Sequence, residues 1–156
     1  MGGALNVPGN VDSHVAGGHD GSAEWNAYWD PHAVARVWQT GIPIVMCPLD
    51  TTNRAPVTKQ FIDQLRAQSK FPLSKLASDS YQKVLTKTGM FFWDVLATSY
   101  LGRPEMFQLR ECQTVIVTDG PSAGRTKIQP GGRKVLALDR VDLDEFYAYL
   151  LKQLRQ

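Results

Sequence analysis

The chain has 156 residues, of which 43% are hydrophobic and 21% charged; this composition is typical of one ordinary globular domain and excludes a disordered protein. Its formal net charge is +2 with Lys and Arg scattered along the chain, so it lacks the basic stripe that a nucleic-acid partner needs. Because no apolar run approaches the ~20 residues of a membrane helix and no signal peptide is recognisable, we expect a cytoplasmic protein with no membrane partner.

Residues 1–22 are rich in Gly, Asn, Asp, Ser and His and follow no hydrophobic period, so we predict a long loop there. Long loops within compact domains are usually either functional or mobile. The glycines of this loop lie between Asn10 and Glu24, and we expect 11–22 to close over a substrate.

A helix is predicted from His32 to Thr40, because Asp30-Pro31 supplies an N-cap followed by proline at the first helical position. We expect it to end at Gly41 and to bury Val34, Val37 and Trp38. The apolar run from Ile42 to Leu49 favours a short buried strand of a parallel sheet, with a polar loop at 50–53 after it.

Three helices are predicted next. Thr58 caps the first of them, whose apolar face holds Phe61, Ile62 and Leu65. The second covers about 74–87 and ends at Gly89. The third is helical from about Asp94, is closed by Gly102, and has as its inward-facing residues Val95, Leu96 and Leu101.

The last part of the chain predicts strands at 114–118 and 134–138, with a turn at 119–124 between them. Asp142 and Glu145 form a capping box for a final helix, whose apolar stripe is Leu143, Phe146, Leu150 and Leu154. Helices that alternate with short apolar strands favour a layered α/β fold.

Several polar and aromatic residues are candidates for a binding site, and each has a structural alternative. Glu24 and Asn26, two apart on a predicted extended segment, project together and could bond sugar hydroxyls, or they form a solvated turn. Asn10 fits a binding role or a left-handed turn. Asp94 is either an N-cap or a carboxylate for a hard cation or a sugar hydroxyl. Trp93 is either part of the core or a stacking surface for an aromatic ligand.

The cysteines and histidines offer weaker signals. Cys47 and Cys112 have apolar surroundings and no CxxC spacing, so we expect buried, reduced thiols rather than a disulfide. His14 and His19 lie in the glycine-rich loop at a spacing that fits no strong zinc pattern, and we expect no structural zinc there.

Five stretches of the chain together resemble the nucleoside hydrolase family, the ribohydrolases often called inosine-uridine preferring. In matching order and approximate spacing they are MGGALNVPGNV (1–11), AEWNAYWDPHA (23–33), PIVMCPLDTT (43–52), FFWDVLATSYLGRPEMF (91–107) and VIVTDGPSAGRTKI (115–128). The resemblance implies an open, mostly parallel α/β sheet flanked by helices, with one Ca²⁺ at the carboxyl ends of its strands. It also implies hydrolysis of the N-glycosidic bond of a small-molecule nucleoside substrate, in purine salvage.

The resemblance assigns roles to individual residues. Met1 and Asn10 match positions at the ribose end of the substrate. Glu24 and Asn26 match ligands of the ribose hydroxyls, and Asp94 matches a calcium ligand that also contacts a ribose hydroxyl. Oxygen ligands of this kind suit calcium, which takes about 6–8 of them.

The chain departs from the family pattern in two ways. Trp93 stands where many members have a histidine that protonates the leaving base; tryptophan there resembles the purine-preferring branch, where it stacks on the base. Such a stack is worth about 0.5–1.5 kcal/mol beyond burial. The aspartate-rich N-terminal motif of the family is absent from the sequence, and Met1 coincides with a residue from the middle of the family's chain. We therefore expect 1–156 to be a single domain, the C-terminal half of the catalytic domain.

Three functional hypotheses follow. The first is the C-terminal portion of a purine-leaning nucleoside hydrolase, inactive by itself and open to homo-oligomer formation. The second is a non-catalytic module that binds nucleosides or a partner, with exposed sheet edges that a partner chain must cover. The third is an unrelated glycosidase with Glu24 and Asp94 as its acid and base, which requires carboxyl groups about 5–10 Å apart.

Overall fold

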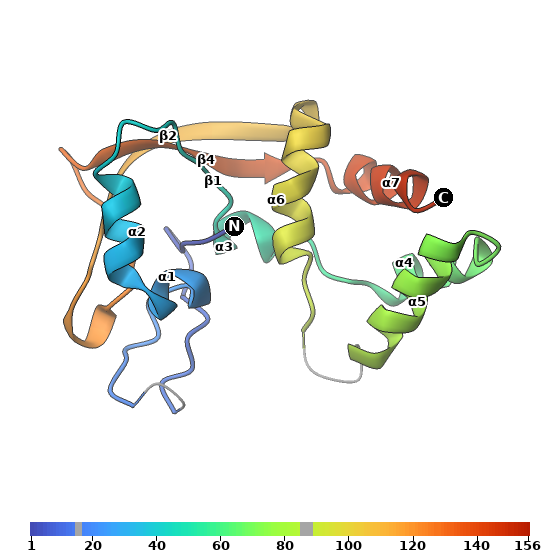
Figure 1. The fold of residues 1–156 in the computed structure, drawn as a ribbon, viewed down its shortest axis with the longest axis horizontal. Coiled ribbons are helices and arrows are strands. Elements are labelled where there is room, and N and C mark those ends of the chain that lie inside the picture. The colour runs from blue at the N-terminus through green and yellow to red at the C-terminus, as the bar shows by residue number, and fades with distance from the viewer. Residues whose placement is uncertain (15–16, 85–88) are drawn as a thin grey trace. The chain divides into compact units, whose positions relative to one another are not determined.

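The computed structural model describes residues 1–14, 17–84 and 89–156. The chain divides into two compact units (Figure 1). The first unit comprises residues 1–52 and 107–140, and the second comprises residues 53–106 and 141–156. That the two act as one domain stays a prediction, and each unit is described by itself below.

The first unit is built on a four-stranded sheet in the order β1-β4-β2-β3. Its strands are β1 (Val45–Met46), β2 (Phe107–Ile116), β3 (Thr126–Ile128) and β4 (Arg133–Val141). β1 runs parallel to β4, with Val45 opposite Leu136, and β2 runs antiparallel to β3. The open sheet, with helices of the same unit beside it, confirms the predicted α/β fold.

One face of this sheet forms a small hydrophobic core under helix α2 (Pro31–Trp38). The buried members of the core come from the three strands β1, β2 and β4, and they are Met46, Cys112, Val135 and Ala137. Trp38 packs against them, and its indole N–H donates to the Thr114 hydroxyl at 2.9 Å. The sheet is therefore covered on this side by a tryptophan whose one polar atom is satisfied.

Helix α2 confirms part of its prediction. Asp30 caps it by accepting from the Ala33 N–H at 2.8 Å, as the Asp-Pro pair indicated. The predicted burial of Val37 is wrong, since that side chain is 46% exposed. Cys47 and Cys112 are buried thiols that form no disulfide, as expected.

Two short helices replace segments that were predicted to be irregular. Helix α1 (Trp25–Trp29) occupies the segment predicted as extended, and helix α3 (Leu49–Thr52) occupies most of the predicted polar loop. The third short element, a 3-10 turn at Gly120–Ser122, falls inside the predicted turn. Periodicity could not find helices of four or five residues, because so short a segment shows no repeat of its apolar side.

The second unit is mainly helical. Its elements are α4 (Lys59–Ala67), α5 (Pro72–Val84), α6 (Trp93–Gly102), a 3-10 turn (Pro104–Met106) and α7 (Leu143–Gln153). The largest fully buried side chains of this unit are Phe61, Phe92, Phe146, Leu65 and Leu96. None of the helices in the described ranges has both the length and the apolar character needed to cross a bilayer.

Several sequence predictions for the second unit are confirmed. Thr58 caps α4 by accepting from the Phe61 N–H at 3.1 Å, and Asp142 caps α7 by accepting from the Glu145 N–H at 2.9 Å. Both caps satisfy an N–H group that has no partner inside its own helix. The predicted helix at 74–87 is confirmed to Val84, and residues 85–88 lie outside the described residues.

Other predictions for the second unit are wrong in detail. Leu101 was expected to face inward, but it is 83% exposed at the end of α6. Glu145 does not complete a capping box, because its carboxylate pairs with Arg103. An arginine that offers a charged partner outside the helix competes successfully with the N-cap backbone N–H.

Candidate functional site

Glu24 is buried, and both of its carboxylate oxygens are occupied by backbone donors. Oε1 accepts from the Asn26 N–H at 3.0 Å, while Oε2 accepts from the Ala27 N–H and the Gly3 N–H, both at 3.3 Å. Only 2% of the residue is exposed. Glu24 therefore caps α1 and ties the N-terminal segment to it, which corrects the prediction of a side chain projecting beside Asn26 from an extended segment.

Asn10 supports the same helix end. Its side-chain oxygen accepts from the Trp25 N–H at 2.7 Å, and its own N–H donates to the Ala23 carbonyl at 3.0 Å. The preceding Gly9 lies so close to Ala23 that a Cβ on it would be 2.0 Å from the carbonyl oxygen. Asn10 and Glu24 together satisfy the first three N–H groups of α1, a capping role that neither sequence reading of Asn10 included.

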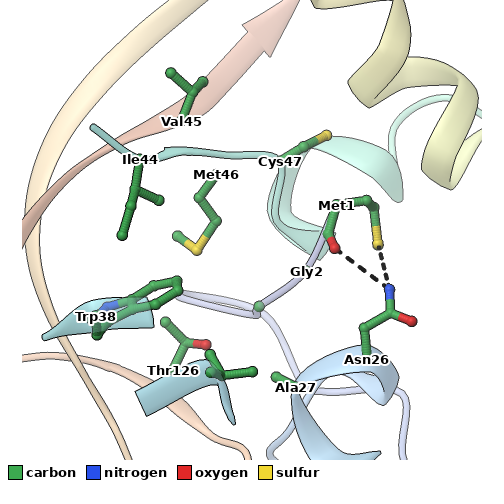
Figure 2. A pocket seen from close by; sticks show the side chains of 12 residues that line it. Met1, Gly2, Asn26, Ala27, Trp38, Ile44, Val45, Met46, Cys47 and Thr126 are labelled. Carbon is green, nitrogen blue, oxygen red and sulfur yellow. Dashed lines mark hydrogen bonds between the residues drawn. The ribbon is translucent and has the colours of Figure 1, made fainter. Parts of the chain in front are cut away.

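Asn26 and Met1 lie side by side in the structure, and their roles toward a ribose stay a prediction. The side-chain amide of Asn26, an exposed residue, donates toward the Met1 carbonyl at 3.4 Å and its sulfur at 3.5 Å (Figure 2). Both residues line a pocket of about 230 Å³ in the first unit. The pocket is lined also by Gly2, Gly3, Ala27, Val34, Trp38, Ile44, Val45, Met46, Cys47 and Thr126.

The pocket combines an apolar wall with a few polar groups, which is the usual make-up of a small-molecule site. Trp38, Ile44 and Met46 supply apolar surface, and the Asn26 amide and the Met1 carbonyl lie together on another side (Figure 2). Gly3, at φ +86°, passes so close that a Cβ would meet the Met46 sulfur at 2.9 Å. A glycine is therefore required where the chain enters this pocket.

Sequence reasoning missed Asp50 as an organiser of the same region. Its carboxylate accepts from the Leu5 N–H and the Asn6 N–H, each at 2.8 Å, and from the Asn6 amide at 3.2 Å. The sequence offered one signal for it, since Asp50 directly follows the apolar run that ends at Leu49. Asp50 and Glu24 thus hold the first six residues from two sides.

The second half of the glycine-rich loop is fastened to the turn at 120–123. The Nδ1 atom of buried His19 accepts from the Gly21 N–H at 3.0 Å, so Nε2 carries the proton and donates to the Ala123 carbonyl at 2.9 Å. Both ring nitrogens are engaged by backbone, which leaves none for a metal. In the ranges that the structure describes, no group of three or more His, Cys, Asp or Glu residues could hold a metal ion.

Asp20 adds a charged contact to this fastening. Its carboxylate accepts from the Ser122 hydroxyl and from the Ser22 N–H, and these hydrogen bonds lower the pKa of Asp20 to about 2. The Asp20 N–H also donates to the Pro121 carbonyl at 2.8 Å. Residues 19–22 are thus attached to the turn, and closure of the loop over a substrate stays a prediction.

Trp93 and Asp94 lie in the second unit, in the first turn of α6. The N-cap alternative for Asp94 is wrong by two residues, because the cap position belongs to Phe92, and Asp94 is exposed. Trp93 is half-buried with its ring centroid 5.8 Å from that of Phe91. Its indole N–H is buried without a hydrogen-bond partner among the described residues.

The candidate residues thus fall into two sets, Met1 with Asn10, Glu24 and Asn26 in one unit, and Trp93 with Asp94 in the other. Convergence of the two sets around one ligand stays a prediction. The glycosidase hypothesis loses its support from Glu24, since an acid or base needs an oxygen that can reach the substrate and those of Glu24 are engaged in the interior.

Comparison with known proteins places this geometry in a family. The family model for inosine-uridine preferring nucleoside hydrolases matches residues 1–148. The chain belongs to this family. The non-specific ribonucleoside hydrolase RihC of Salmonella paratyphi A is 36% identical over 114 residues, which cover 72% of this chain and 38% of that relative.

Solved structures agree with the assignment. The inosine-uridine preferring nucleoside hydrolase of Bacillus anthracis superposes with a TM-score of 0.90 at 34% identity, over 99% of this chain and 49% of that one. A purine-preferring ribonucleoside hydrolase of Gardnerella vaginalis shares the fold with a TM-score of 0.77 at 22% identity, over 99% of this chain and 50% of that one. The chain therefore spans about half the length, or less, of these family members.

Proposed function

We propose that this chain supplies the ribose- and base-contacting part of a nucleoside hydrolase, which cleaves the N-glycosidic bond of a ribonucleoside with water to release the free base and ribose. The observation that carries the proposal is the pairing of Asn26 with Met1 at a pocket, inside a chain that matches the family over 1–148. The Asn26 amide, and the Met1 carbonyl that it approaches, provide a donor and an acceptor for adjacent hydroxyl groups.

In this proposal Glu24 and Asn10 contribute to sugar binding through the helix that they cap. The three N–H groups that they hold fix the start of α1, and Asn26 lies in the first turn of that helix. A ligand-binding amide on a rigid helix end keeps its orientation when the sugar arrives, which reduces the entropy lost on binding. The exposed Asn10 retains its amide nitrogen for a direct contact with the ribose end of the substrate.

Trp93 is the proposed contact for the base. Its half-buried indole can stack on a purine. A stack contributes about 0.5–1.5 kcal/mol, which corresponds to a purine preference of about 2- to 12-fold. We therefore propose a purine-leaning enzyme rather than one restricted to purines.

Calcium does not fit the described residues of this chain by themselves. Asp94 is exposed and offers two carboxylate oxygens, whereas Ca²⁺ takes about 6–8 oxygen ligands. We propose that Asp94 contributes to a calcium site whose other ligands come from outside the described residues. Isothermal titration of CaCl₂ into this chain is then expected to show no saturable binding below about 1 mM.

The test of the proposal is nucleoside binding, measured by saturation-transfer NMR with inosine, uridine, free ribose and hypoxanthine. We expect inosine to bind more tightly than uridine, and Asn26→Ala to weaken both by about tenfold, the cost of about one hydrogen bond. Asn53→Ala is the matched control, since Asn53 is an exposed asparagine of the second unit. Equal binding by wild type and Asn26→Ala would contradict the proposal.

Catalysis is expected to be absent from the 156-residue chain alone, because the carboxylate that activates water is not among the candidate residues. Incubation with inosine, adenosine or uridine, followed by chromatography of the free base, checks this expectation. Release of base above the uncatalysed rate, lost in Asn26→Ala, would show that the chain is a complete catalyst.

A further inference from the structure

We propose that Asp119 is a site of isoaspartate formation, the spontaneous modification that reroutes the main chain through the side-chain carboxyl group of an aspartate. Asp20, which stands in the same kind of sequence, is protected from this modification by its hydrogen bonds. The inference concerns the chemistry of the chain itself and goes beyond nucleoside binding and hydrolysis.

The sequence contains the pair Asp-Gly twice, as Asp20-Gly21 and as Asp119-Gly120. In such a pair the backbone nitrogen of the glycine can attack the side-chain carbon Cγ of the aspartate. Because glycine has no Cβ, the attack meets less steric hindrance than it does before other residues. The sequence gives the two pairs the same reactivity, so a difference between them must come from the structure.

The modification needs no reactant except water. A bond forms between the glycine nitrogen and Cγ, and the bond from Cγ to the hydroxyl oxygen of the protonated carboxyl group breaks. One molecule of water leaves, and a five-membered imide remains. Water then adds to one of the two imide carbonyl groups. Addition at the main-chain carbonyl gives isoaspartate with a free α-carboxylate, whereas addition at Cγ restores aspartate.

The two pairs are alike in exposure and in backbone conformation. Asp20 and Asp119 are both exposed, so water reaches each of them. The glycines that follow them have nearly the same positive φ, +77° at Gly21 and +75° at Gly120. Neither property can therefore separate the two pairs, and their hydrogen bonds become decisive.

The reacting groups of Asp20-Gly21 are both engaged. The Gly21 N–H donates to Nδ1 of His19 at 3.0 Å. The Asp20 carboxylate accepts from the Ser122 hydroxyl and from the Ser22 N–H, and these bonds lower the pKa of Asp20 to about 2. Attack requires a free nitrogen and a neutral carboxyl group, so the attachment of this segment must open before the pair can react.

The reacting groups of Asp119-Gly120 are open. The Gly120 N–H, at the start of the 3-10 turn, makes no hydrogen bond with the described residues. The Asp119 side chain is 82% exposed and does not cap the turn. It accepts from the hydroxyl of Thr118 at 2.7 Å and lies 3.9 Å from Nε2 of His32. Neither contact holds the Gly120 nitrogen, so local rotation at Asp119 is enough to bring Cγ to it.

The modified residue would stand beside an attachment point of the glycine-rich loop. The Asp20 N–H donates to the Pro121 carbonyl at 2.8 Å, and Nε2 of His19 donates to the Ala123 carbonyl at 2.9 Å. An isoaspartate at 119 adds a methylene carbon to the backbone just before these acceptors. The modification therefore changes the turn to which residues 19–22 are attached.

The experiment compares the two pairs in one chain. The folded chain is incubated at neutral pH and physiological temperature, and mass spectrometry of its peptides with electron-transfer fragmentation locates isoaspartate. The chain in urea is the reference, because the hydrogen bonds of both pairs are then lost. We expect similar rates at the two sites in urea, and in the folded chain a rate at Asp119 at least about tenfold higher than at Asp20.

Two conservative variants provide a matched pair, Asp119→Glu and Asp20→Glu. A glutamate would have to form a six-membered imide, which closes more slowly. The product is measured by an isoaspartyl methyltransferase, which transfers a labelled methyl group from S-adenosylmethionine to the free α-carboxylate of isoaspartate. Asp119→Glu is expected to remove most of the label that the aged, folded chain accepts, and Asp20→Glu to leave it unchanged. Circular dichroism shows whether each variant is folded.

Equal rates at the two sites in the folded chain, or a higher rate at Asp20, would overturn the proposal. So would the absence of isoaspartate at Asp119 over a period in which the chain in urea forms it. A Gly21 amide that is unprotected in hydrogen exchange would also contradict it, because the contrast depends on the bond from Gly21 to His19. None of these measurements involves a nucleoside, so this proposal and the proposed function can fail independently.

Discussion

Each of the two units has a hydrophobic core, but the contacts that surround the candidate residues differ between them. In the first unit, carboxylate and amide side chains bind backbone N–H groups of distant segments, as Glu24 does with Gly3 and Asp50 with Leu5. In the second unit, aromatic rings pack on one another, with Phe92 at 5.2 Å from Phe61 and 5.5 Å from Phe146. The hydrogen bonds of the first unit are directional, so they fix the path of a loop. The packed rings of the second unit form a core whose stability depends less on the exact orientation of each side chain.

This difference accounts for where the candidate site lies. A binding site needs polar groups held at fixed positions, and fixed polar groups require other polar groups to hold them. Four of the six candidate residues, Met1, Asn10, Glu24 and Asn26, belong to the unit that is organised by such bonds. The second unit contributes Trp93 and Asp94 at the start of helix α6.

The largest expected effect is a loss of stability in the second unit. Phe92→Ala removes a fully buried ring that contacts four other aromatic residues, and we expect a loss of about 3–5 kcal/mol in the free energy of unfolding. Urea denaturation measures the loss, and hydrogen exchange locates it. Leu101→Ala, at a side chain that is 83% exposed, is the control and should change stability by no more than about 0.5 kcal/mol.

Exchange in Phe92→Ala is expected to accelerate mainly in residues 53–84 and 89–106. An equal acceleration at the amides of Gly3 and Ala27 would show that the two units unfold together, and would remove the basis for contrasting them.

The next largest expected effect is a loss of stability in the first unit. Glu24→Ala leaves three backbone N–H groups without their buried acceptor, and we expect a loss of about 2–4 kcal/mol together with faster exchange at Gly3, Asn26 and Ala27. Glu111→Ala is the matched control, because that carboxylate is 60% exposed and pairs with Lys134 at the surface. The control should lie within about 1 kcal/mol of wild type. A Glu24→Ala variant as stable as the control would mean that Glu24 is a free ligand and not an organiser of α1.

The smallest effect is on the attachment of the glycine-rich loop. Because hydrogen bonds from Ser122 and Ser22 hold the pKa of Asp20 at about 2, below its ordinary value of 3.8, the charged form favours the folded loop. The contribution is fully present above pH 3.8 and is lost as the pH falls through about 2. Ser122→Ala should move the pKa of Asp20 upward, toward 3.8, in an NMR titration of its carboxyl carbon.

Ser80→Ala, an exposed serine in helix α5, is the control for this titration and should leave Asp20 unchanged. A pKa of Asp20 near 3.8 in the wild-type chain would show that the loop is not attached through this carboxylate.

The difference between local patterns and long-range hydrogen bonds explains which helices could be predicted from the sequence. Helices α4 and α7 were predicted with their caps, because apolar spacing and a capping residue agree over two or more turns. Helix α1 was missed, because its five residues show no period and its caps come from Asn10, fifteen residues before Trp25, as well as from Glu24. Polar side chains in a glycine-rich segment therefore indicated hydrogen bonding. They did not indicate whether the bonding partner is a ligand or the backbone of the same chain.

The candidate site residues were chosen from the family motifs, because local patterns do not connect them. The pairing of Met1 with Asn26 depends on residues at opposite ends of a 26-residue segment, and no spacing rule connects them. Thr126 and Trp38 line the same pocket from other elements and were not predicted there, since each reads locally as part of a strand or a helix face. Long-range hydrogen bonds of side chains to backbone are the part of the structure that the sequence pattern does not contain.

The most direct test of the ribose-binding assignment is a titration of inosine into the ¹⁵N-labelled chain. We expect the side-chain amide resonances of Asn26 and the backbone amides of Gly2 and Gly3 to shift together and to saturate at millimolar concentrations. Free ribose should produce the same pattern more weakly, and hypoxanthine should leave Asn26 unmoved. Shifts that never reach Asn26, at inosine concentrations up to about 10 mM, would contradict the assignment.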